Sequence, residues 1–358
     1  MQSFTFLFLV AALAFTGCAG RRCPVRGDER AQFFPTYASF SEGNWTVPVH
    51  GRIFTPREES EVQTVALRVA GRLLGREEQA AILRERIRSF WVKGENGRRV
   101  DIALAGKDYR PAKSDESGHF QGNIRMPPSA AAPQGEPRWL EYSLAGCGEA
   151  GRELKGKVGL LEGPGLSVVT DVDALQAPAP PGRLARSERV LFQELAAQPG
   201  MAVAYENWAK QGAAFHYLSD LPWQLFPEVS RLLEGLPQGS VELRKLDWEG
   251  FGKGSPLQAV DRLLEALSGS RQQLAASLED LIARYPDRRL VLVGDGGGAA
   301  PEVFAAAARR HPDRIRLIAV RAAPDAREKA RQSLQGLPEG SWTLFEKPSE
   351  LARVAGAK

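Results

Sequence analysis

The chain is poor in the residues that build metal clusters and disulfide frameworks. Its 358 residues include three cysteines and four histidines, and no Cys-x-x-Cys pair or Cys/His cluster has the spacing of a zinc site. This scarcity argues against a structural metal. The excess of basic over acidic residues is also small, because the formal net charge is only +4, and the basic residues form no stripe. The composition therefore gives no sign of nucleic-acid binding.

An apolar run of membrane-spanning length is missing as well. The run from Phe4 to Gly17 falls short of the about 20 residues that a spanning helix needs. It has the length of a signal-peptide core, and residues 15–18, Phe-Thr-Gly-Cys, resemble a bacterial lipobox in which Cys18 would be lipidated. No Lys or Arg precedes the run, and Phe stands where Leu is usual. A lipoprotein leader over residues 1–17 is the favoured interpretation; an ordinary cleaved signal and a buried helix are the alternatives.

The lipoprotein interpretation predicts a periplasm-facing protein of the bacterial cell envelope. Gly20, two places after Cys18, is not Asp, which under the enterobacterial sorting habit favours the outer membrane. If Cys18 carries lipid, Cys23 and Cys147 remain as a candidate disulfide in an oxidising periplasm.

The body of the chain has enough length and apolar content (43%) for two domains. Residues 18–45 are polar and irregular, and we predict a tether there. Residues 46–161 contain short runs of strand-forming residues between turn signals, which predicts a small β-sandwich. From residue 162 to 358 strands and helices alternate, which predicts a parallel sheet of the Rossmann type. Continuous apolar runs in that part are typical of strands covered on both faces.

Several of these strands end in polar residues. Asp171 and Asp173 follow the run at 166–170, Ser219 follows the run at 214–218, and Asp295 follows the run at 290–294. The carboxyl ends of parallel strands share one edge of the sheet, where α/β proteins bind ligands. We therefore expect these side chains to converge. A lone Asp-x-Asp is more often a turn or helix cap, so the prediction depends on the set and its order.

That order resembles the haloacid-dehalogenase-type phosphotransferases, and the details resemble their actin-patch-associated phosphatidate phosphatase branch over roughly residues 47–347. The family carries SDIDDT where this chain has TDVDAL at 170–175, and PGM as at 199–201. It carries HYLS-small-SPWQL where this chain has HYLSDLPWQL at 216–225. Its LxGDSGxxDPE compares with LVGDGGGAAPE at 292–302.

The resemblance implies a role for each matched residue. Asp171 would be the nucleophile that forms a phospho-aspartate, and Asp173 the general acid and base. Ser219 would donate a hydrogen bond to the transferring phosphoryl group. Asp171, Asp173 and Asp295 are the candidate ligands of Mg²⁺, an ion that prefers oxygen donors. The implied reaction is Mg²⁺-dependent hydrolysis of a phosphomonoester, with phosphatidate as the family's substrate.

The chain departs from the family at residues that take part in the family's reaction. Ala174 and Leu175 replace an Asp and a Thr, and Ala300 replaces the second Asp of the last motif. The Lys that steadies the phospho-aspartate falls at Leu274, and Asp220 adds a carboxylate beside Ser219. Arg271 and Lys253 are the candidate replacements for that cation. The alternative to an active enzyme is thus a catalytically degenerate envelope lipoprotein that binds a phosphorylated ligand or a protein.

Overall fold

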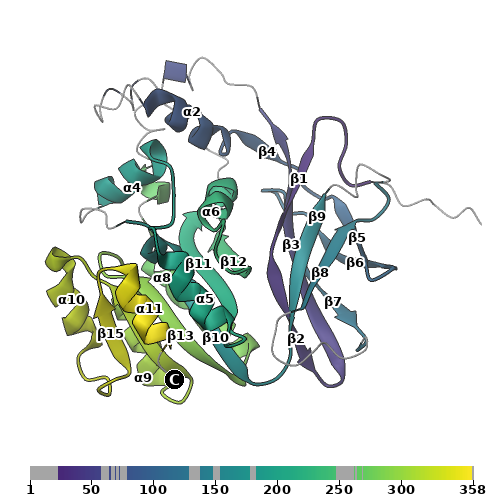
Figure 1. The fold of residues 1–358 in the computed structure, drawn as a ribbon. Helices are drawn as coiled ribbons and strands as arrows, with labels where there is room; N and C mark the ends of the chain where they lie inside the picture. Colours follow the sequence, from purple (N-terminus) through teal and green to yellow (C-terminus); the bar gives the residue numbers. More distant parts are fainter. Residues whose placement is uncertain are drawn as a thin grey trace, which may run out of the picture.

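The computed structural model describes residues 23–57, 64–65, 69, 72, 79–128, 138–147, 154–177, 183–246, 262, 264–267 and 269–356. Within them, two sheets lie side by side, an N-terminal sheet with few helices and a C-terminal sheet surrounded by helices (Figure 1). Among the residues described, no helix is long and apolar enough to cross a membrane. Cys18 lies outside them, so its lipidation stays a prediction.

Among the described residues, the N-terminal sheet has nine strands of mixed direction. Its main path runs β1-β3-β2-β9-β8-β5-β6, and β4 and β7 also pair with β3. The strands are β1 (Arg30–Phe34), β2 (Thr36–Ser41), β3 (Asn44–Pro56), β4 (Val92–Gly94), β5 (Arg99–Leu104), β6 (Lys107–Lys113), β7 (His119–Met126), β8 (Arg138–Leu144) and β9 (Lys155–Leu161). All of them join in one hydrogen-bonded sheet, and a division into the two packed layers of a sandwich stays a prediction. Helix α2 (Ala80–Arg88) precedes β4.

The start of this sheet corrects the predicted tether at 18–45. Strands β1 and β2 lie inside that range and contribute buried aromatic side chains at Phe34 and Tyr37. Pro35 separates two short apolar runs that become strands only because β3 and β9 pair with them. A disulfide between Cys23 and Cys147, with a sulfur–sulfur distance of 2.01 Å, ties the chain near β1 to the segment after β8.

The C-terminal sheet is wholly parallel, in the order β12-β11-β10-β13-β14-β15. Its elements are β10 (Gly165–Asp171), η2 (Val172–Leu175), α4 (Arg183–Phe192), α5 (Met201–Ala209), β11 (Ala214–Pro222), η3 (Trp223–Leu225), α6 (Phe226–Leu232), β12 (Ser240–Arg244), α8 (Arg271–Arg284), β13 (Arg288–Asp295), α9 (Ala300–Arg310), β14 (Ile315–Arg321), α10 (Pro324–Leu334), β15 (Trp342–Phe345) and α11 (Pro348–Gly356). The predicted α/β arrangement with a parallel sheet is confirmed.

Both faces of the C-terminal sheet are covered. Val168 and Val291 pack into one core cluster, and their chain neighbours Val169 and Leu292 pack into a second. Because successive side chains of a strand point to opposite faces, continuous apolar strands require cover on both sides. This burial fixes the central strands β11, β10 and β13, and their carboxyl ends carry the candidate site.

Aromatic contacts join the two sheets. The rings of Phe34 and Trp223 lie 3.9 Å apart between centroids, and the Tyr285 hydroxyl donates to the Tyr37 carbonyl oxygen at 2.9 Å. Trp223 belongs to η3, because β11 continues through Pro222. The residues that follow Ser219 therefore anchor the carboxyl end of β11 against the N-terminal sheet.

Candidate functional site

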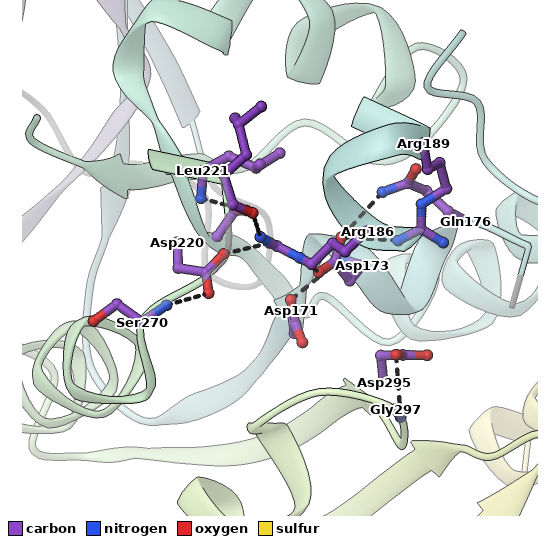
Figure 2. A network of polar contacts seen from close by, with 12 residues as sticks. Asp171, Asp173, Gln176, Arg186, Arg189, Asp220, Leu221, Ser270, Asp295 and Gly297 are labelled. Carbon is purple, nitrogen blue, oxygen red and sulfur yellow. Dashed lines mark hydrogen bonds and ion pairs between the residues drawn. The ribbon is translucent and has the colours of Figure 1, made fainter. Parts of the chain in front are cut away.

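The predicted aspartates do lie at one edge of the parallel sheet. Asp171 ends β10 and is in register with Leu218 of β11, the residue before Ser219. Asp295 ends β13, the strand on the other side of β10. After Asp171 the chain turns through η2, and the Asp171 carboxylate accepts a hydrogen bond from the Asp173 backbone N–H at 3.2 Å. The three aspartates appear together in Figure 2.

Asp173 is bound by side chains of its own domain (Figure 2). Arg186 donates through Nε to Oδ2 at 2.7 Å, and Arg189 donates through Nη2 to Oδ1 at 3.3 Å. The amide of Gln176 also donates to Oδ1 at 3.2 Å. Arg186 and Arg189 lie one turn apart on α4, so both reach the same carboxylate. Both oxygens of Asp173 are therefore engaged by positively charged donors.

Arg186 also connects Asp173 to Asp220. It donates to one Asp220 oxygen through Nη2 and to the Leu267 carbonyl oxygen through Nη1 at 2.6 Å. The other Asp220 oxygen accepts from the Ser270 backbone N–H at 2.7 Å. The sequence suggested that Asp220 would add charge close to an anionic ligand. In the structure its charge is instead paired with Arg186, and the two side chains are only 17% and 16% exposed.

Asp295 has a cation of its own. Its carboxylate pairs with Arg321 at the end of β14, a side chain that is only 1% exposed. Arg321 also donates to the Asp173 carbonyl oxygen at 3.0 Å, and the Gly297 backbone N–H donates to Asp295 at 3.2 Å. Arg321 thus contacts Asp173 and Asp295, two of the three residues that the sequence predicted as metal ligands.

Burial and the neighbouring charges shift the pKa values of the aspartates in opposite directions. Burial, followed by the charges of Asp173, Asp220 and Asp295, raises the pKa of Asp171 well above its ordinary range. Burial also acts to raise the pKa of Asp173, but the adjacent guanidinium groups outweigh it and the pKa is lowered. Burial raises the pKa of Asp295 against the opposing effect of Arg321. Asp171 therefore favours its protonated form, and Asp173 its ionised form.

A small cavity of about 170 Å³ lies beside this network. Asp171, Asp173, Arg186 and Asp220 line one side of it, and residues at the amino ends of α8 and α9 line the other: Gly269, Ser270, Arg271, Leu274, Gly298 and Ala299. Ser219 and Asp295 are not part of that lining. The Ser219 hydroxyl oxygen accepts from the Leu221 backbone N–H at 3.1 Å and is buried, so its role toward a phosphoryl group stays a prediction.

The position of the family's lysine is apolar here. Leu274 lines the cavity, and Arg271, one of the two predicted replacements, lines it as well. The Arg271 guanidinium pairs with Glu302, and its side chain is 62% exposed. Lys253 lies outside the described residues. The cations that contact the predicted acid and base Asp173 are instead Arg186 and Arg189, which the sequence pattern did not single out.

The carboxylates do not fit a magnesium ion as they stand. A Mg²⁺ site needs oxygen donors free to face the metal in near-octahedral geometry. Arginines already hold Asp173 and Asp295, and no group of three or more His, Cys, Asp or Glu in the described part of the chain is arranged to hold a metal ion. The predicted set of Asp171, Asp173 and Asp295 therefore finds no support in this geometry.

Comparison with known proteins bears on this domain. Residues 166–322 match the family model described as phosphatidate phosphatase APP1, catalytic domain. The resemblance to that family is confirmed. The matched stretch contains Asp171, Asp173, Ser219 and Asp295 of the phosphatidate phosphatase-like domain, together with Arg186 and Arg321.

Other similarities are more distant. An uncharacterized protein of Schizosaccharomyces pombe is 25% identical over 177 residues, which are 46% of this chain. The chain spans only about a quarter (26%) of that relative's length. Among solved structures, Bacteroides thetaiotamicron EndoBT-3987 with its Man5GlcNAc product aligns over 81% of this chain and 77% of that one, at 6% identity and a TM-score of 0.19. A carbohydrate esterase aligns over 91% of this chain and 96% of that one, at 8% identity and a TM-score of 0.22. TM-scores this low relate neither the folds nor the functions.

Proposed function

We propose that the phosphatidate phosphatase-like domain of this chain binds the phosphate of a phosphatidate-type phosphomonoester without hydrolysing it by the magnesium-dependent phospho-aspartate route. The observation that carries the proposal is the double arginine contact on Asp173. A general acid must hold a proton at the working pH, whereas these contacts keep Asp173 ionised. The nucleophile must be ionised, whereas its surroundings favour protonated Asp171. The pKa of the predicted nucleophile is thus raised and that of the predicted general acid lowered, which is the reverse of what the reaction requires.

The cavity retains features that favour an anion. The amino ends of α8 and α9 both border it, and the exposed N–H groups of a helix amino end attract negative charge. Arg271 lies on the same wall and can exchange its exposed partner Glu302 for a phosphate oxygen. Protonated Asp171 can donate a hydrogen bond to that phosphate. Phosphatidate is the proposed ligand class because the family match covers this part of the chain.

Magnesium-dependent hydrolysis of the same phosphomonoester is the second candidate. It is favoured by the family match, which includes Asp171, Asp173, Ser219 and Asp295 in the expected order. Those residues and the order of the parallel strands also support our proposal that the domain is of the haloacid-dehalogenase type.

One experiment separates the two candidates. Phosphate release from phosphatidate and from an aryl phosphate is measured with and without Mg²⁺, for the unaltered protein and for Asp171→Asn, and phosphate binding is measured by calorimetry on the same samples. The binding proposal predicts phosphate binding and equal background release in both proteins. Release that requires Mg²⁺ and disappears in Asp171→Asn would establish the hydrolase instead.

We further propose that the protein is a periplasm-facing lipoprotein, anchored through Cys18, in the outer membrane. The leader pattern supports this, and the Cys23–Cys147 disulfide is of the kind that persists in oxidising compartments. Lipid on Cys18 would hold the domain close to phospholipid. The expected result is metabolic labelling with a fatty acid in the unaltered protein and none in Cys18→Ser. Equal labelling of the two would refute the anchor.

A further inference from the structure

A second and larger cavity lies away from the aspartates, between the N-terminal sheet and α2. Its volume is about 570 Å³, within the range of small-molecule sites. Its walls come from β1, β3, the end of α2, β4, and the residues Gln224 and Pro227 of η3 and α6. In Figure 1, α2 and β4 lie at the top, above β1 and α6. None of the predicted catalytic residues lines the cavity.

The register of β1 and β3 explains why polar groups face this cavity. Phe34 pairs with His50, Gln32 with Arg52, and Arg30 with Phe54, so these three pairs share one face of the sheet. Trp223 covers the first pair, with ring centroids 3.9 Å from Phe34 and 4.7 Å from His50. Members of the next two pairs form part of the cavity wall.

Charge in the cavity is strongly one-sided. Four arginines line it against one glutamate: Arg30, Arg52, Arg57, Arg88 and Glu85. The glutamate is itself paired with Arg231 at 3.1 Å. The remaining walls include the apolar side chains of Phe54, Pro56, Trp91 and Val92. The cavity thus combines an excess of cations with an apolar surface.

Arg52 points most directly to a ligand. Its side chain is only 5% exposed, and its guanidinium carbon lies 5.4 Å from the centre of the Phe54 ring. Its Nε donates to the Ser117 carbonyl oxygen at 2.9 Å, which leaves the two Nη groups without a hydrogen-bond acceptor among the described residues. A buried charge without a partner is costly, and burial lowers the pKa of Arg52 to about 10 against the opposing charge of Asp115. The planar fork of two free Nη groups matches the oxygens of a phosphate or carboxylate.

We propose that this cavity binds an amphiphile whose oxyanion head group lies against Arg52 and whose apolar body lies along Phe54 and Trp91. Arg30 and Arg88 stand at the exposed part of the lining and would draw the anion in by long-range attraction. This proposal does not depend on the function proposed for the Asp171 cavity, because the two cavities share no lining residue.

Calorimetric titration of the full chain tests the proposal. The probes are octyl phosphate, octanoate and inorganic phosphate, and vesicles containing phosphatidate form a separate arm. Arg52→Gln should weaken binding of the amphiphile roughly tenfold to a hundredfold, because a hydrogen bond to a charged group contributes about that much. The double variant Arg30→Gln/Arg88→Gln should weaken it less and should make it less dependent on salt. Octanoate is the decisive probe, because octyl phosphate and inorganic phosphate can also bind at the Asp171 cavity.

The matched control is Arg289→Gln/Arg353→Gln, which removes two exposed arginines of the C-terminal domain. Unaltered amphiphile affinity in Arg52→Gln, with folding verified by circular dichroism, would overturn the proposal. So would an equal loss in the control, or no binding of any probe by the unaltered protein. A loss of affinity for both octyl amphiphiles in Arg52→Gln, with binding of inorganic phosphate unchanged, supports recognition of head and body together, because Arg52 does not line the Asp171 cavity. Binding that is confined to phosphatidate vesicles and lost in Arg52→Gln supports the same chemistry presented by a lipid surface.

Discussion

Replacement of Arg186 by methionine is the sharpest probe of the arginine–carboxylate network. The change keeps much of the side-chain length but removes the hydrogen bonds to Asp173, Asp220 and the Leu267 carbonyl oxygen. The two carboxylates are 12% and 17% exposed, so water replaces the lost partner poorly. Removing one partner of such a buried pair costs about 3–5 kcal/mol in the free energy of unfolding. Asp173 keeps Arg189, so we expect a loss at the lower end, near 3 kcal/mol.

The assay is urea-induced and thermal unfolding at pH 7. A loss of about 3 kcal/mol corresponds to a fall of roughly 6–12 °C in Tm for a domain of this size. The control is Arg353→Met, which removes an exposed arginine from α11 and should change stability by no more than about 0.5 kcal/mol. Adding Asp220→Asn to Arg186→Met should restore part of the loss, because the unpaired charge is then removed.

The pH dependence gives a second check of the same reasoning. The folded pKa of Asp173 lies below its unfolded value of about 3.9, so its stabilisation is present above that pH and disappears as the pH falls through the folded pKa. The difference between the unaltered protein and Arg186→Met should therefore narrow below about pH 4. A loss no greater than that of Arg353→Met, or a difference that stays constant into acid, would refute the network as a source of stability.

Three further outcomes follow from the same structure. Asp171→Asn should raise the free energy of unfolding at pH 7 and leave it unchanged near pH 3 in urea titrations. A carboxyl group with a raised folded pKa destabilises the folded state only as the pH rises above the pKa of that group in the unfolded chain. Lower stability of the variant at pH 7 would contradict this. Cys23→Ser/Cys147→Ser should lose about 2–5 kcal/mol, since the bond closes a separation of 124 residues, and reductant should then have no additional effect on Tm. Trp223→Ala should cost about 3–5 kcal/mol by urea unfolding, because the ring is 2% exposed and packs on Phe34; a loss under 1 kcal/mol would be inconsistent with that packing.

The sequence sufficed to place the aspartates. Unbroken apolar runs end in Asp171 and Asp295, and the rule that parallel strands share their carboxyl edge was enough to bring them together. His216 lies inside the apolar run at 214–218 and is a buried core residue, and its ring contacts the hydroxyls of Ser240 at 2.8 Å and Ser167 at 3.3 Å. These features depend on local pattern and on one topological rule.

The arginines could not be placed in the same way. Arg186 and Arg189 lie on a helix with many charged residues, and solvated faces look the same in sequence. Their spacing of one turn on the helix that follows the Asp-x-Asp was the available signal, but which carboxylate they reach depends on how α4 packs. Arg321 ends β14 as Asp295 ends β13, and strand pairing alone would have made them neighbours had the strand order been known. Strands β1 and β2 were missed because long-range pairing, not local propensity, makes them strands.

The departures from the family pattern at Leu274 and Asp220 are explained by their combined effect on the charge of the site. Leu274 removes a cation from the cavity, and Asp220 adds an anion, so each change alone would make the site more negative. Arg186 offsets both changes, since it pairs with Asp173 through Nε and with Asp220 through Nη2. A buried arginine supplies fixed charge with no need for an ion from solution, but it also fixes Asp173 as an anion. The network therefore holds the strand ends in place, but it disfavours the protonated form of Asp173 that a general acid needs.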